Sequence, residues 1–295
     1  MFRSSAMAML LVLLGPAAQA APVEAWRLDG LAEPWSAWFD ASRNVVFVSN
    51  VAGDPLAKDG NGFIARVGLK GRLIERDWVS GLDAPKGMSA LGGQLYVADI
   101  DRIVAVDLAT GEVTRRWPVP GARSLTDVYA AQRSGRVFVS DALTDTVWVL
   151  KDGKLDVFAQ DAELRGPAGL RVNAGRLVVA GTGGAAGAGR LTAVNLEDSR
   201  IWELGGSAVS GHLLGLDAIG DDGWYVTDPV AGLLDKAAKS APAGSETAVA
   251  AIQNAIAAAT SAFGNMNAVA KQFADAAQAN VAAVTKATTA AAKKK

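Results

Sequence analysis

The chain has 295 residues, of which 50% are hydrophobic, and a formal net charge of −1. It contains no cysteine and a single histidine, His212. The composition therefore excludes disulfides, thiolate nucleophiles, Cys-ligated zinc and any site that needs two imidazoles. The nearly balanced charge gives no indication of a nucleic-acid partner, and we expect none.

The N-terminus, residues 1–20, has the three parts of a secretory signal peptide. Arg3 supplies a positive charge, the run AMAMLLVLLG is apolar, and the triplet AQA (18–20) is a small-residue cleavage site. The apolar run is too short to span a bilayer as a helix, so we expect no transmembrane segment. The pattern predicts a mature chain that begins at Ala21 and is periplasmic or secreted.

A hydrophobic strand that ends on a small residue, usually followed by Asp or Asn, recurs along the body of the chain. Its instances are roughly 40 to 50 residues apart, which is the period of a four-stranded propeller blade. Short alternating strands with Gly- and Asp-containing turns between them are typical of an antiparallel all-β repeat. The instances are NVVFVSN (44–50), GQLYVADI (93–100), GRVFVSDA (135–142), GRLVVAGT (175–182) and GWYVTDPV (223–230).

The repeat predicts an all-β propeller domain over 21–230, with four complete blades followed by part of a fifth. We expect only the first two strands of the fifth blade, because the alternating pattern ends after Gly232. The predicted ring is therefore incomplete, with about four and a half blades. The predicted blades occupy about 31–82, 83–122, 123–165, 166–208 and 211–230.

Three long phrases follow one another between residues 44 and 150: NVVFVSNVAGDPLAKDGNGFIARV, APKGMSALGGQLYVADI and LTDVYAAQRSGRVFVSDALTDTVWVL. With the rest of 24–230 they resemble the gluconolactonase/regucalcin-like family of six-bladed β-propellers, and most of all its exported bacterial members. The resemblance implies that this chain holds a truncated propeller. It also implies hydrolysis of sugar lactones assisted by a divalent cation (Ca²⁺, Mg²⁺, Mn²⁺ or Zn²⁺) on the central axis.

The resemblance places the family's cation ligands on four residues that are poor ligands for a hard cation. Trp, Leu and Ala side chains offer no oxygen donor, and a Thr hydroxyl is a weak one. Glu33, Asp127 and Asp217 lie one to three residues away, but a slip of one residue turns a strand side chain to the opposite face. We therefore expect no cofactor, and a divalent cation only if lactonase activity survives. The four positions are Trp35, Thr126, Ala168 and Leu214.

The Asp and Asn residues that close the recurring strands have two interpretations. We expect them to cap turns by bonding to nearby backbone, and the alternative is a ring of acids that lines a channel. Lys86, in the phrase APKGM, is a candidate cation for an anionic ligand on the propeller face. His212 is expected to form local hydrogen bonds rather than to bind a metal. The closing residues are Asn50, Asp99, Asp141 and Asp228.

The composition changes after the repeats. Pro242 and Gly244 mark residues 231–244 as a linker, and 245–292 combine abundant alanine with apolar residues at alternating steps of three and four. This pattern predicts an α-helical, Ala-rich tail with a narrow apolar stripe, suited to an apolar surface or a partner helix. The stripe contains Ile252, Ile256, Phe263, Met266 and Phe273.

The segment SAPAGSETAVAAIQNAIAAATSAFGNMNAVAKQF resembles the C-terminal part of phasins, with a match over about 234–292. Phasins coat polyhydroxyalkanoate granules, so the resemblance implies binding to a polyester granule surface in the cytoplasm. This location conflicts with the export that residues 1–20 predict. We therefore hypothesise that the reading frame is a fusion of two gene fragments.

The residues favour an exported β-propeller of gluconolactonase-like ancestry that acts as a binding or scaffold domain without catalysis. Its partner would be a small molecule or a protein bound on the propeller face. Two alternatives stay open: a phasin-like granule-associated structural protein that works through its C-terminal helix, and a metal-dependent sugar lactone hydrolase.

Overall fold

The structure is a computed structural model that describes residues 26–183, 188–204, 209–219, 223–228 and 233–237. The predicted signal peptide (1–20) and the predicted phasin-like helix (245–292) with its apolar stripe lie outside the described residues and stay predictions. Within the described ranges, no helix is long and apolar enough to cross a membrane.

The described chain forms five sheets of antiparallel strands that follow one another in sequence. The first contains β1 Pro34–Asp40, β2 Val45–Asn50, β3 Gly62–Gly68 and β4 Leu73–Leu82. The second contains β5 Pro85–Leu91, β6 Gln94–Asp99, β7 Arg102–Asp107 and β8 Val113–Pro118. The third contains β9 Leu125–Ala131, β10 Arg136–Asp141, β11 Thr146–Lys151 and β12 Lys154–Gln160.

A short 3₁₀ turn, η1 Ala162–Leu164, leads into the fourth sheet. That sheet contains β13 Pro167–Asn173, β14 Arg176–Gly181, β15 Gly189–Asn195 and β16 Ile201–Glu203, and β17 Ser210–Gly211 pairs with β15. The fifth sheet contains β18 Gly215–Ile219, β19 Gly223–Asp228 and β20 Leu233–Ala237.

Strand β2 shows why the recurring phrase forms a strand. Its sequence VVFVSN is rich in β-branched residues, and Asn44 just before it adopts a positive φ of 52°, which Asn tolerates in a tight turn. Val45 and Phe47 are buried on one face, as the period of two requires. β2 pairs with β1 on one side and β3 on the other, which satisfies its backbone groups.

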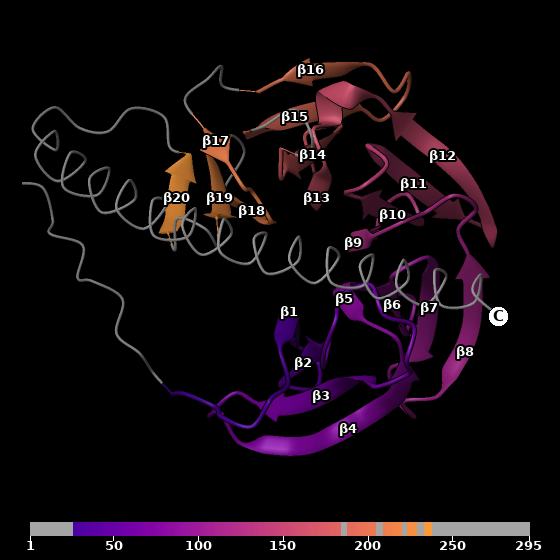
Figure 1. The fold of residues 1–295 in the computed structure, drawn as a ribbon, viewed down its shortest axis with the longest axis vertical. Helices are drawn as coiled ribbons and strands as arrows, with labels where there is room; N and C mark the ends of the chain where they lie inside the picture. Colours follow the sequence, from indigo (N-terminus) through magenta and orange to yellow (C-terminus); the bar gives the residue numbers. More distant parts are fainter. Residues whose placement is uncertain (1–25, 184–187, 205–208, 220–222, 229–232, 238–295) are drawn as a thin grey trace, which may run out of the picture.

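The five sheets follow one another in an arc around a common axis, with β1, β5, β9, β13 and β18 on the side nearest to it (Figure 1). Each of these inner strands contacts the inner strand of the next sheet. Consecutive antiparallel sheets arranged radially define a β-propeller, so the β-propeller part of the predicted fold is confirmed. The first and fifth sheets form the two ends of the arc (Figure 1).

The fifth sheet differs from its prediction. We expected two strands and no further β-structure, but Leu233–Ala237 forms β20 and pairs with β19 from Trp224↔Ala237 to Asp228↔Leu233. Within the linker predicted over 231–244, Leu233–Ala237 therefore forms a strand. The segment LLDKA has high helix propensity and lacks the alternation of apolar and polar residues that indicates a strand. It forms a strand because the edge of β19 supplies hydrogen-bond partners for its backbone.

The hydrophobic core lies between the faces of consecutive sheets rather than in one central mass. Phe47 and Ile64 of the first sheet pack with Leu95 and Val97 of the second, and the Phe47 and Trp78 rings lie 4.5 Å apart. Corresponding clusters join the second sheet to the third, the third to the fourth and the fourth to the fifth. Each sheet therefore depends on its neighbours for burial, as expected of a repeat architecture.

Serine hydroxyls link neighbouring sheets near the axis. Ser49 Oγ accepts a hydrogen bond from the Ser36 N–H (3.1 Å) and donates one to the Lys86 carbonyl of the next sheet (2.7 Å). Ser140 Oγ repeats the pattern with the Asp127 N–H (3.0 Å) and the Ala168 carbonyl (2.7 Å). Each hydroxyl thus satisfies two backbone groups and sets the distance between two inner strands.

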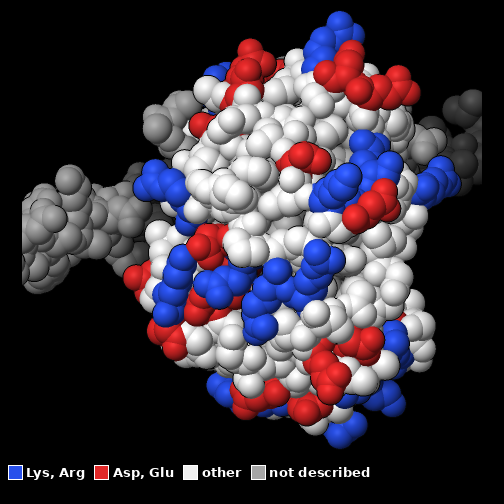
Figure 2. All heavy atoms as spheres, turned by 90° about the vertical axis from the view of Figure 1, so that its right-hand side faces the viewer, with Lys and Arg blue, Asp and Glu red and all other residues white. Residues whose placement is uncertain are grey.

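The outer surface of the arc carries charges of both signs. Figure 2 shows Lys and Arg interspersed with Asp and Glu over the face that includes β8 and β12, without a region of a single sign that covers it. This distribution on the face shown agrees with the formal net charge of −1. An extended single-sign surface for nucleic acid is therefore not present on this face.

Candidate functional site

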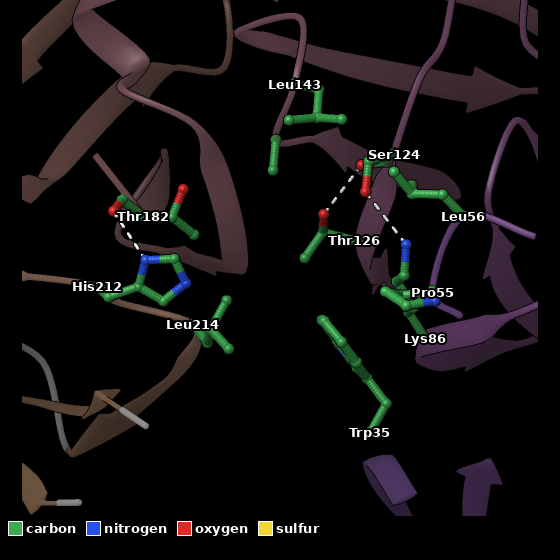
Figure 3. A pocket seen from close by; sticks show the side chains of 11 residues that line it. Trp35, Pro55, Leu56, Lys86, Ser124, Thr126, Leu143, Thr182, His212 and Leu214 are labelled. Carbon is green, nitrogen blue, oxygen red and sulfur yellow. Dashed lines mark hydrogen bonds between the residues drawn. The ribbon is translucent and has the colours of Figure 1, made fainter. Parts of the chain in front are cut away.

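A pocket of about 450 Å³ lies where the inner ends of all five sheets converge (Figure 3). Trp35 comes from β1, Lys86 from β5 and Thr126 from β9, and Leu214 directly precedes β18. Thr182 follows β14 of the fourth sheet. The remaining lining residues are Pro55, Leu56, Ser124, Ala142, Leu143 and His212.

One position of the repeat supplies four of the pocket-lining residues. Trp35, Lys86, Thr126 and Ala168 are each the second residue of an inner strand, and Leu214 holds the equivalent place before β18. The ladder register shifts at this point in the first four sheets. A register shift of this kind changes the direction in which a strand's side chains point. It therefore lets the side chains at this repeated position point toward the axis.

Three of the four residues to which the family resemblance assigned ligand positions line the pocket. Trp35, Thr126 and Leu214 meet in the pocket, whereas Ala168 is fully buried in β13 and does not line it. Sequence reasoning treated Lys86 separately from these four residues. The sequence does indicate that Lys86 shares their repeat position, because Pro-Lys-Gly (85–87) aligns with Pro-Ala-Gly (167–169).

Lys86 is the only charged side chain among the pocket-lining residues that the structure describes. Its residue surface is 1% exposed, and its Nζ donates a hydrogen bond to Ser124 Oγ at 3.1 Å. Nζ also lies 5.5 Å from the centroid of the Trp35 ring. No ion pair joins Nζ to a carboxylate within the described part of the chain, so the charge has only a neutral hydrogen-bond partner there.

Burial lowers the pKa of Lys86 from 10.5 to about 8, because the pocket walls solvate the ammonium poorly. The carboxylates of Asp99, Asp141 and Asp54 act in the opposite direction and raise this pKa. Lys86 is thus mainly charged at pH 7 but much easier to deprotonate than an ordinary surface lysine.

The two buried acids that raise the pKa of Lys86 are themselves bonded to backbone N–H groups. Asp99 accepts hydrogen bonds from the Asp83 and Ala84 N–H groups, and Asp141 accepts from Arg123 and Ser124. The other strand-closing residues behave alike: Asn50 accepts from Ala32, and Asp228 accepts from His212. The prediction that these residues bond to backbone is confirmed, but these N–H groups lie 15 to 18 residues earlier, in the segment before the inner strand of the same sheet, and not in an adjacent turn. Asn50, Asp99 and Asp141 are buried and do not line the described pocket, which argues against the alternative of an acid-lined channel.

His212 lies on the opposite side of the pocket from Lys86 (Figure 3). Its Nδ1 is 3.1 Å from the Thr182 carbonyl, which can only accept, so Nδ1 carries the proton in this bond. Its backbone N–H donates to Asp228. The prediction of local hydrogen bonding is confirmed, and the ring is left with Nε2 as an acceptor when neutral.

The donor set does not fit the divalent cation that the family resemblance implies. Trp35 and Leu214 have no oxygen, and Thr126 Oγ1 donates to the Ser124 carbonyl at 3.0 Å. A fixed ammonium also stands at the same repeat position in β5, where it would repel a cation. No group of three or more His, Asp or Glu residues lies close enough to hold a metal within the described ranges.

The three nearby acids are not substitutes either. Glu33 Oε2 accepts from the Gly53 N–H at 2.7 Å, and Asp217 pairs with Arg171 at 3.2 Å. Asp127 accepts from the Leu170 N–H at 2.9 Å, and desolvation raises its pKa to about 6. A Cβ at Gly87 would overlap the Asp127 carboxylate, so β5 and β9 approach closely there.

The fold and the pocket together define a β-propeller with an axial, mostly apolar pocket that contains one buried cation. Known structures share the fold. A catalytically inactive virginiamycin B lyase from Staphylococcus aureus with quinupristin is 12% identical, covers 69% of this chain and 83% of its own, and has a TM-score of 0.50. A nidogen/laminin complex chain is 20% identical over 67% of this chain and 73% of its own, with a TM-score of 0.51.

These identities establish the β-propeller fold and not an activity. No known family matches the sequence, and no curated protein does.

Proposed function

We propose that the propeller is a non-catalytic binding domain whose axial pocket takes a small carboxylate with an apolar body. The observation that carries this proposal is the buried ammonium of Lys86. It lies in the pocket wall with a neutral hydroxyl as its hydrogen-bond partner, and no described carboxylate is paired with it.

The pocket wall offers a binding group for the carboxylate of such a ligand and apolar surface for its body. A buried ammonium next to apolar groups attracts an anion more strongly than a solvated lysine does, because water screens it less. Trp35, Leu56 and Leu214 provide apolar surface for the body of the ligand. A volume of about 450 Å³ falls in the range of small-molecule pockets.

The sequence-based expectations outside the described residues belong to the same proposal. An exported propeller, as residues 1–20 predict, would meet its ligand in the periplasm or outside the cell. The phasin-like segment would add contact with an apolar surface or a partner helix. Lactone hydrolysis is not favoured, since the axial residues lack donors for the cation that it requires.

The proposal is tested by isothermal titration of the full chain with benzoate, phenylacetate and phenylacetamide at pH 7. We expect the two carboxylates to bind and the neutral amide to bind at least about tenfold more weakly, because it lacks the charge that Lys86 pairs with. The variant Lys86→Met should lose this preference, while Lys151→Met, at the exposed end of β11, should keep it. Equal binding of acid and amide by the wild-type chain would contradict the proposal.

A further inference from the structure

We propose that Lys86 is also a reactive amine, which forms an imine with small aldehydes that enter the axial pocket. This inference shares the axial pocket with the proposed function and rests on it in that respect alone. It assigns to that pocket a reversible covalent chemistry that anion binding does not require.

The surroundings of Nζ carry the proposal. An amine attacks a carbonyl through its nitrogen lone pair, so a lysine held in a salt bridge is unreactive. Nζ of Lys86 has the Ser124 hydroxyl at 3.1 Å as its hydrogen-bond partner, and no ion pair holds it within the described residues. The buried carboxylates of Asp99 and Asp141 are engaged by backbone N–H groups.

The pocket also supplies the space that a reactant needs. Nζ lies on the wall of a cavity of about 450 Å³, beside the Trp35 ring, although the residue as a whole is 1% exposed (Figure 3). A small aldehyde with an aromatic or aliphatic body fits that volume, and Leu214 and Trp35 offer it apolar contacts. A surface lysine has neither the cavity nor the desolvation.

Desolvation raises the fraction of the reactive form. Since the pKa of Lys86 is lowered to about 8, Lys86 is neutral in about a tenth of the molecules at pH 7. A lysine with the ordinary value of 10.5 is neutral in only about one molecule in three thousand at that pH. The neutral amine at Lys86 is therefore several-hundred-fold more abundant than at an ordinary lysine.

The reaction is a condensation that needs no oxidant or reductant. The neutral nitrogen attacks the aldehyde carbon and forms a C–N bond, which gives a carbinolamine after a proton moves from nitrogen to oxygen. The C–O bond then breaks, and the oxygen leaves as water with the second amine hydrogen. Lysine and aldehyde thus become an imine and one water molecule.

The experiment treats the full-length protein with benzaldehyde and sodium cyanoborohydride between pH 6 and 10. The hydride reduces any imine to a secondary amine and fixes the adduct. Trypsin does not cleave after an alkylated lysine, so modification of Lys86 joins residues 77–86 and 87–102 into one peptide, whose yield mass spectrometry measures. We expect Lys86 to be labelled at least about tenfold faster than Lys70 or Lys151, both exposed, with a rate that rises through pH 8.

Labelling of Lys86 at or below the rate of the exposed lysines would overturn the inference, and this comparison uses the wild-type chain alone. The variant Lys86→Arg separates the two proposals, because arginine keeps the positive charge but forms no imine under these conditions. Retained phenylacetate binding with no adduct is expected. If Lys86→Met keeps normal phenylacetate binding while wild-type Lys86 is labelled selectively, the proposed function fails and the reactive amine stands.

Discussion

Nζ of Lys86 lies 5.5 Å from the centroid of the Trp35 ring, although the two residues belong to different sheets. They occupy the same position in successive repeats, so the irregular start of each inner strand turns both toward the axis. The ring face stabilises a cation, and its free surface can stack on a ligand. In the proposed function, this pair would favour a carboxylate with an aromatic body.

Replacement of the ring tests that selectivity. Trp35→Ala should weaken phenylacetate binding about tenfold, because both ring contact and desolvation of Lys86 are reduced. Acetate, which makes no aromatic contact, should be affected less. Titration of both ligands measures the difference. The matched control Trp202→Ala, on the outer strand β16, should leave both affinities unchanged, and an equal loss for the two acids would argue against stacking.

Binding should also depend on pH in a defined direction. Lys86 is cationic below its lowered pKa of about 8, and phenylacetate is ionised above about pH 5. Affinity should therefore be level between pH 6 and 7 and fall as the pH rises through about 8. Titration calorimetry at several pH values measures the profile. An affinity that stays constant up to pH 10 would show that the ammonium is not the anion's partner.

Removal of the buried charge should stabilise the fold. The folded-state pKa of Lys86 lies below its unfolded value of 10.5, so below about pH 8 the folded state carries the full cost of a desolvated cation. Lys86→Met should raise the free energy of unfolding by about 1–3 kcal/mol at pH 7. Between about pH 8 and 10.5 the wild-type chain sheds this cost, so the difference should shrink.

Urea unfolding of both proteins at pH 7 and pH 10 measures these free energies. A variant that is less stable than the wild type at pH 7 would mean that the Ser124 hydrogen bond outweighs desolvation. In that case the account of Lys86 as an electrostatically costly residue kept for binding is wrong.

The serine links between sheets give a separate prediction about stability. Ser140→Ala leaves the Asp127 N–H and the Ala168 carbonyl without their shared partner, which should cost about 1–3 kcal/mol. Ser80→Ala, at an exposed position of β4, should change stability by less than about 0.5 kcal/mol. Urea denaturation measures both, and equal effects of the two variants would remove the linking role from Ser140.

Much of the fold could be predicted because its signals are local. The recurring phrase that ends at Asn50, Asp99 and Asp141 marks the second strand of the first three sheets. The Gly- and Asp-containing turns indicate where the adjacent strands begin and end. Strand β20 could not be predicted, since Leu233–Ala237 has no alternation and becomes a strand by pairing with β19. Its conformation depends on a partner edge, not on its own residues.

The pocket was only partly predictable for a similar reason. The repeat and the family resemblance indicated the positions of Trp35, Thr126 and Leu214, which do converge. The burial of Lys86 depends on neighbouring parts of the fold, because Trp35 of the first sheet and Ser124, just before the third, lie beside its Nζ. A single lysine beside a turn normally indicates an exposed residue. The one indication that Lys86 is buried was its alignment with the apolar residue Ala168, which is itself buried.

Crystallography of the full chain with 4-bromophenylacetate shows directly whether Lys86 binds the carboxylate of an apolar acid. Anomalous scattering locates the bromine, and the electron density places the carboxylate. We expect bromine in the axial pocket near Trp35 and Leu214, with a carboxylate oxygen within hydrogen-bond distance of Lys86 Nζ. An occupied ligand whose carboxylate points away from Lys86, or bromine found only outside the pocket, would contradict it.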